Sequence, residues 1–197
     1  MQQTKVLADR SFPRENFTSD VLRILAANVL MILCAQIAIP LPWTPVPITG
    51  QTFGVLLVAV LLGSRRGALA LGLYLLEGAA GFPVFQPFGM PGPARFFGPT
   101  AGYLLSYPVA AYFTGWLIER GAAKNFFRLC GALVAGDALI FIGGCSWLAA
   151  SLHLGGAAVL SQGAVPFLPG EVLKIALILA AIRGVQLAKT KRVAAGA

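Results

Sequence analysis

The stretch VLRILAANVLMILCAQIAIPLPWTPVPITG, residues 21–50, decides the fold class of this chain. Its first part, residues 21–39, contains a single charged side chain, that of Arg23. A helix of that length crosses ~30 Å of hydrocarbon at ~1.5 Å per residue. Four prolines between residues 40 and 47 then exclude a helix, because proline lacks a backbone N–H and restricts the residue before it. The stretch therefore predicts a membrane-spanning helix followed by a rigid apolar loop.

The composition extends this interpretation to the whole chain. Of its 197 residues, 57% are hydrophobic and 11% are charged, which is too little charge to solvate the surface of a soluble protein. The net charge of +8 does not indicate nucleic acid binding, because the basic residues are dispersed between apolar segments and form no continuous stripe. Membrane lipid with anionic headgroups is the expected partner of these charges.

Further apolar runs predict more helices. The second and third, at residues 52–63 and 68–80, are short, so we expect one or both to begin beneath a re-entrant loop. Residues 81–99 are rich in Pro, Gly and Phe and predict an ordered cap or lid. A Gly/Ser/Ala-rich loop is expected before the last helix. The remaining helices are predicted at residues 100–118, 127–152 and about 171–187.

The basic residues fall into four tracts separated by apolar runs, as the positive-inside rule describes. This distribution predicts an even number of crossings with both termini in the cytoplasm. The fold class is therefore an all-α polytopic membrane protein: a leader at residues 1–20, a six-helix domain at residues 21–188 and a tail at residues 189–197. Outside the tracts stand Arg95 and Lys174. The tracts comprise Lys5, Arg10, Arg14 and Arg23; Arg65 and Arg66; Arg120, Lys124 and Arg128; and Arg183, Lys189, Lys191 and Arg192.

Four ionisable residues inside or beside apolar runs are candidates for function, because charge is costly at bilayer depth unless it is paired or hydrated. Glu171 and Lys174 are three residues apart on one helix and so face the same way; they form either a self-neutralising pair or the floor of a binding site. Glu77 lies near the end of the third helix, where it is either interfacial or functional. Asp137 either contacts a ligand or bonds to a neighbouring helix.

Polar side chains in two loops are further candidates. Thr49 and Thr52 act either as helix caps or as ligand contacts. The amide of Gln51, in apolar surroundings at that depth in the membrane, needs hydrogen-bond partners. Arg95 beside two phenylalanines either reaches a lipid headgroup or contacts a ligand. Together with Tyr103 and the Glu/Lys pair, this set suits a small ligand with a polar head and an apolar body.

The sequence offers no catalytic or metal-binding constellation. It has one histidine, His153, and three cysteines without metal-ligand spacing. It has no Walker A motif and no G-x-S-x-G motif, so ATP would be used by another polypeptide. We expect no metal, no cofactor and no enzymatic activity. Two alternatives remain: a small intramembrane lipid-modifying enzyme that uses Glu171, Lys174 and His153 as acid–base groups, and a structural subunit without a ligand.

Five motifs, in order, resemble the BioY family, whose members are the biotin-binding substrate components of energy-coupling factor (ECF) transporters. The resemblance runs from about residue 20 to residue 188. In the last motif the family usually has Asp where this chain has Glu171. The motifs are PVPITGQT at 45–52, LGxRRG at 62–67, GAAGFPVF at 78–85, GPTAGY at 98–103 and PFLPGExxK at 166–174.

The resemblance implies a six-helix protein of the prokaryotic cell membrane with an externally open biotin pocket, capped by the loop between the first two helices. It implies partners as well, namely a transmembrane coupling subunit and ATPase subunits, although some members are thought to work without them. Another vitamin is the alternative ligand. Contact with the coupling subunit is expected through Ala27, Met31 and Ala35. The expected ligand contacts are Thr49, Gln51, Arg95, Tyr103, Asp137, Glu171 and Lys174.

Overall fold

The structure of this chain is a computed structural model. It describes residues 17–195, and it describes side chains for residues 17–185. Some residues of the predicted basic tracts therefore lie outside the described part. These are Lys5, Arg10 and Arg14 of the leader and the side chains of Lys189, Lys191 and Arg192 of the tail.

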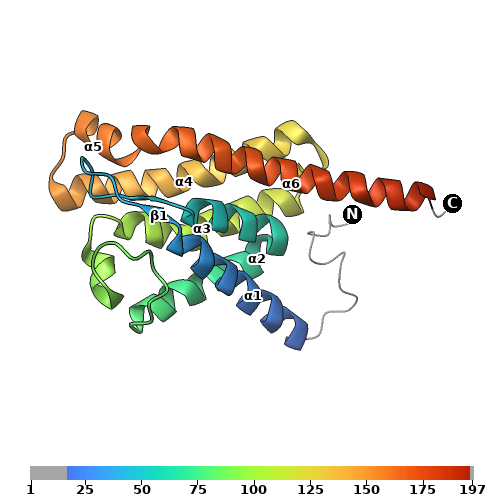
Figure 1. The fold of residues 1–197 in the computed structure, drawn as a ribbon, viewed down its shortest axis with the longest axis horizontal. Coiled ribbons are helices and arrows are strands. Elements are labelled where there is room, and N and C mark those ends of the chain that lie inside the picture. The colour runs from blue at the N-terminus through green and yellow to red at the C-terminus, as the bar shows by residue number, and fades with distance from the viewer. Residues whose placement is uncertain (1–16, 196–197) are drawn as a thin grey trace.

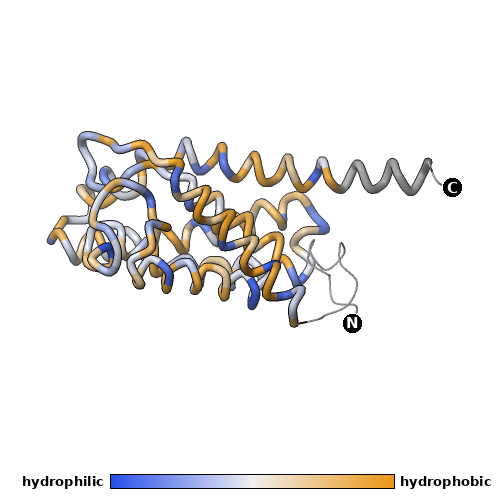
Figure 2. The backbone as a smooth tube through the Cα atoms, turned by 60° about the horizontal axis from the view of Figure 1, so that its bottom comes forward, coloured by the Kyte–Doolittle hydropathy of each residue, from blue (hydrophilic) through white to orange (hydrophobic). Residues whose placement is uncertain are grey.

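The described chain is helical apart from two short strands, and its long helices lie side by side (Figure 1). Hydrophobic residues run along these helices (Figure 2), as expected for a bundle in lipid. The elements are α1 (Phe17–Gln36), β1 (Ala38–Ile39), β2 (Ile48–Thr49), α2 (Gln51–Ala79), η2 (Gly92–Phe97), α3 (Ala101–Glu119), η3 (Ala122–Lys124), α4 (Phe126–Leu152), α5 (Gly156–Gly163), η4 (Val165–Phe167) and α6 (Leu168–Ala195).

The proline-rich loop leaves α1 and returns beside it. β1 and β2 pair antiparallel, with Ala38 opposite Thr49, a ribbon that the sequence did not predict. The loop is tied down at its tip, where the Thr44 hydroxyl donates to the carbonyl oxygen of Gln162 in α5 at 2.7 Å and accepts from the Val46 N–H at 3.2 Å. The loop therefore delivers the start of α2 to the same end of the bundle as α5.

α2 contains the two predicted helices, and the chain reverses between them at Gly63. A Cβ built on Gly67 would lie 3.5 Å from the Cα of Ala59, although eight residues of straight helix span about 12 Å. The predicted helices at 52–63 and 68–80 leave residues 64–67 for the turn between them, but those residues are already helical. Gly63 alone makes the reversal, because its φ of 80° and ψ of −167° lie in a region that glycine alone adopts readily.

The reversal is held by the end of α3. The Glu119 carboxylate accepts from the backbone N–H of Ser64 at 2.7 Å and from its hydroxyl at 2.8 Å. It thereby satisfies donors that the first turn of a helix otherwise leaves unpaired. A Cβ on Gly115 would lie 2.3 Å from the carbonyl carbon of Gly63, so the two backbones are in direct contact.

Gly63→Ala is expected to lower the stability of the protein by about 1–3 kcal/mol, the usual strain of a side chain in this backbone region. Gly72→Ala is the matched control, because a Cβ there meets no atom within 4 Å and alanine is the better helix former. Thermal unfolding in detergent measures both. Equal unfolding temperatures for Gly63→Ala and the wild type would contradict a strained reversal.

The last part of the chain is more helical than predicted. The expected Gly/Ser/Ala-rich loop forms α5, since the six residues between Gly156 and Gly163 include neither Gly nor Pro. α6 begins at Leu168, earlier than the predicted Glu171, because Pro169 is compatible with the first turn of a helix.

Four segments of the described chain are long and apolar enough to span a membrane. One of them is the whole of α2, which folds back on itself, so the predicted number of six crossings stays a prediction. The four segments are Phe17–Gln36, Gln51–Ala79, Phe126–Leu152 and Gly156–Val185.

Three basic residues, Arg120, Lys124 and Arg128, lie in or beside the α3–α4 connection, which Figure 1 shows at the opposite end of the bundle from α5. Arg66 pairs with Asp20 at 3.0 Å, and the Arg183 guanidinium lies 4.4 Å from the ring centroid of Phe126. Arg95 lies in η2 of the cap segment, residues 81–99, and this segment lies toward the end of the bundle that carries α5 (Figure 1). This asymmetry agrees with the charge distribution read from the sequence.

The residues predicted to contact a coupling subunit face the interior. Ala27, Met31 and Ala35 are buried, and a Cβ on Gly54 of α2 would lie 2.9 Å from the Met31 sulfur. The exposed face of α1 carries Leu22, Val29 and other apolar side chains. In this conformation the three residues are buried and Met31 packs against α2, and the contact with a coupling subunit stays a prediction.

Candidate functional site

A cavity lies where the proline-rich loop, the cap segment and α2, α3, α4 and α6 meet. It encloses about 520 Å³ of atom-free space, counting its open mouth. Six of the seven residues predicted to contact a ligand line this cavity: Thr49, Gln51, Arg95, Tyr103, Glu171 and Lys174.

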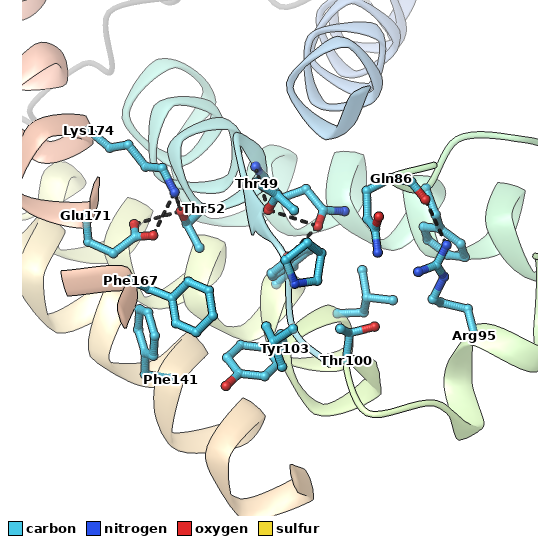
Figure 3. Close-up of a pocket in the computed structure, with 16 residues that line it drawn as sticks. Thr49, Thr52, Gln86, Arg95, Thr100, Tyr103, Phe141, Phe167, Glu171 and Lys174 are labelled. Carbon is cyan, nitrogen blue, oxygen red and sulfur yellow. Dashed lines mark hydrogen bonds and ion pairs between the residues drawn. The ribbon is translucent and has the colours of Figure 1, made fainter. Parts of the chain in front are cut away.

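A closed polar cluster forms one end of the cavity (Figure 3). The Lys174 ammonium donates to Glu171 Oε1 at 2.7 Å and to the Thr52 hydroxyl oxygen at 2.8 Å, and that hydroxyl donates to Glu171 Oε2 at 2.7 Å. Thr52 and Glu171 each lie in the first turn of a helix, where the helix dipole favours a carboxylate. The pair is therefore both self-neutralising and part of the cavity wall, so its net charge is zero.

Gln51 is fixed by a network of hydrogen bonds behind the cavity wall. Its Nε2 donates to the Tyr74 hydroxyl at 2.7 Å, and its Oε1 accepts from Tyr107 at 3.2 Å and from Thr49 at 3.3 Å. Because the amide nitrogen carries two hydrogens, one N–H is left to donate to a ligand. Since Gln51 also lines the cavity, this second N–H is its candidate donor to a ligand.

Aromatic rings form the middle of the cavity. The Tyr103 hydroxyl donates to the Gly163 carbonyl oxygen at 2.6 Å, so this residue contributes its ring rather than its hydroxyl. The Tyr103 and Phe141 rings pack edge to face with centroids 6.0 Å apart, and Phe141 packs against Phe167 at 6.3 Å. These rings suit a flat apolar body.

Arg95 lies at the other end of the cavity from the Glu171–Lys174 pair (Figure 3). Its guanidinium donates to the backbone carbonyl oxygens of Gln86, at 2.8 Å, and Phe88. The side chain is 4% exposed, and its Nε has no hydrogen-bond partner within the described residues.

The charge of Arg95 is not neutralised by any carboxylate of the described residues. Burial lowers the pKa of its guanidinium below the ordinary value for arginine, because the charged form is desolvated, yet arginine remains protonated in proteins. A buried cation without a counterion is an anion-binding group.

Asp137, the seventh predicted contact, lies outside the cavity lining. It is 7% exposed in α4, and its Oδ1 has no hydrogen-bond partner within the described residues. It is close enough to interact electrostatically with Glu171 and Lys174, so it backs the polar cluster. Direct contact of Asp137 with a ligand stays a prediction, and Glu77 likewise does not line the cavity.

Several lining residues were not predicted as ligand contacts. Most of them lie within the motif segments of the sequence, where a polar or aromatic residue beside Pro or Gly is the available signal. Gln86 directly follows such a segment, while Tyr107 and Phe141 lie inside helices, where an aromatic residue is indistinguishable from core. Thr52 lines the cavity as well, in agreement with one of its two predicted alternatives. The residues added by the structure are Val46, Pro47, Phe85, Gln86, Thr100, Leu104, Tyr107, Phe141 and Phe167.

Known proteins resemble this chain in sequence and in fold. Over 171 residues it is 36% identical to the biotin transporter BioY of Rhizobium etli, covering 83% of this chain and 89% of that protein. Over 162 residues it is 38% identical to the biotin transporter BioY of Thermotoga maritima, covering 82% and 91%.

A crystal structure of the S-component for biotin from an ECF-type ABC transporter has the same fold. It superposes with a TM-score of 0.77 at 23% sequence identity, over 88% of this chain and 95% of that one. The model of the BioY family matches residues 2–191. The chain therefore belongs to the BioY family.

Proposed function

We propose that this protein takes up biotin across the cytoplasmic membrane by binding it in the cavity without changing it chemically. The observation that carries the proposal is the order of groups along the cavity: a neutral polar cluster, aromatic walls and an arginine that pairs with no carboxylate among the described residues. Biotin has the same order, with a neutral ureido ring, an apolar sulfur ring and chain, and a carboxylate. The names of the relatives support the same ligand.

The charges favour one orientation of the ligand. The Glu171–Lys174 pair is already neutral, so a carboxylate gains less there than at Arg95, which pairs with no carboxylate among the described residues. The ureido group, with two N–H donors and one carbonyl, matches a carboxylate acceptor and an ammonium donor. We therefore assign the ureido ring to Glu171, Lys174 and the free N–H of Gln51, and the carboxylate to Arg95.

The same proposal includes the arrangement in the membrane and the energy source. Counting both halves of α2 and α3 as spans gives six crossings with cytoplasmic termini, which the gathering of basic residues at one end supports. Because the sequence has no nucleotide-binding motif, energy would come from a coupling subunit and ATPases. If Ala27, Met31 and Ala35 contact that subunit, α1 has to move away from α2.

Isothermal titration of the purified protein with biotin tests the proposal, and a thermal-shift panel with thiamine, riboflavin and folate tests its selectivity. Biotin alone is expected to bind and to raise the unfolding temperature. Binding of another vitamin in its place would reject biotin as the substrate. Uptake of labelled biotin in cells with and without a coupling module then tests the energy source.

A further inference from the structure

A second cavity adjoins the proposed biotin site. It lies between the proline-rich loop and the cap segment and encloses about 670 Å³ of atom-free space, counting its open mouth. It shares Pro47, Gln86, Arg95 and Thr100 with the first cavity. A ligand group bound at Arg95 therefore lies at the boundary between the two spaces.

The walls of the second cavity are mostly apolar. They include Leu41, Met90, Phe88 and prolines of the loop, and Arg95 is the one charged side chain among the described residues that line it. Such walls suit an uncharged alkyl or acyl extension better than a cation.

Arg95 can bind a carbonyl group as well as a carboxylate. Of the five N–H groups of a guanidinium, two donate to the cap carbonyls, one from each terminal nitrogen, so each terminal nitrogen keeps one further N–H. A carboxamide keeps one carbonyl oxygen to accept from these donors while its nitrogen carries a substituent onward. The bond to arginine is weaker without the negative charge, but it is not lost.

We propose that the second cavity is a subsite for groups attached to the carboxyl carbon of the ligand, so that the protein binds N-alkyl amides of biotin as well as the free acid. This inference rests on the proposed function and on the assigned orientation. It extends the substrate class from the vitamin to its carboxyl-linked conjugates.

Titration with biotinamide and with N-butylbiotinamide isolates the extension, because the two ligands differ only in the butyl chain. The butyl amide is expected to bind at least about tenfold more tightly, since burial of an alkyl chain is favourable. Equal or weaker binding of the butyl amide by the wild type would overturn the subsite. Failure of biotin itself to bind would instead overturn the proposed function.

Met90→Trp tests the location of the subsite, because Met90 lines the second cavity but not the first and is half exposed. The larger side chain is expected to weaken binding of the butyl amide at least about tenfold, since it fills the space that the chain needs. Affinity for biotin and biotinamide should change less than twofold, and Met90→Leu should leave all three affinities unchanged. A Met90→Trp variant that binds all three ligands as the wild type does would overturn the assignment.

Discussion

Lys174→Ala is expected to weaken biotin binding about a hundredfold, or ~2.8 kcal/mol at ~1.4 kcal/mol per factor of ten. Lys174 donates both to Glu171 and to Thr52, and without it the Glu171 carboxylate is a buried charge without a counterion. The variant also loses the ammonium assigned to the ureido carbonyl. Isothermal titration measures the affinity, and thermal unfolding without ligand measures the stability.

Two variants separate a binding role of Lys174 from a purely structural one. The double substitution Glu171→Gln with Lys174→Met removes both charges together, so it should recover stability but not affinity. Lys124→Ala changes an exposed lysine in η3, far from the cavity, and should leave both unchanged. Recovery of wild-type affinity in the double variant would show that the pair only supports the fold.

Arg95→Gln is expected to weaken binding of biotin about a hundredfold while it changes binding of biotinamide much less. A charge-assisted bond to a buried carboxylate is roughly twice as strong as a neutral one, and biotinamide cannot form it. Titration of both ligands with both proteins completes a double-mutant cycle, in which the coupling energy belongs to the guanidinium–carboxylate contact.

The cycle also controls for damage to the cap, since Arg95 orders the carbonyls of Gln86 and Phe88. A disordered cap would lower the affinity for biotin and for biotinamide by the same factor, and that result would contradict the assigned orientation. Arg95→Lys keeps the charge but not the fork of donors, so an intermediate affinity is expected. Arg65→Gln, at an exposed position beside the reversal in α2, serves as the neutral comparison.

Much of the fold was predictable because hydrophobic runs and basic tracts are local features of the sequence. The helices at 100–118 and 127–152 were predicted to within one residue of α3 and α4. The ribbon of β1 and β2 was not, because two residue pairs leave no period-2 pattern. The reversal at Gly63 was displaced by one residue, since glycine, serine and arginine are all compatible with a turn and only the backbone angles distinguish them.

The site was predictable where chemistry is conspicuous. A Glu and a Lys three residues apart in an apolar run are recognisable as candidates for function, because burying a charge at bilayer depth costs free energy. Both residues line the cavity. Asp137 carries the same cost but lies behind the wall, because its direction depends on the rotation of α4, which a sequence does not fix. The hydrogen bonding of the Gln51 amide could not be predicted, because its partners Tyr74 and Tyr107 come from the second half of α2 and from α3.

The tether between Thr44 and Gln162 has a kinetic consequence. A neutral hydrogen bond contributes about 1 kcal/mol net. Its loss would therefore change the ratio of the closed to the open conformation of the proline-rich loop only about fivefold. The prolines restrict the backbone of the segment, so we expect it to move as one piece. We therefore expect the dwell time of a bound ligand to depend more on its contacts inside the cavity than on this one hydrogen bond.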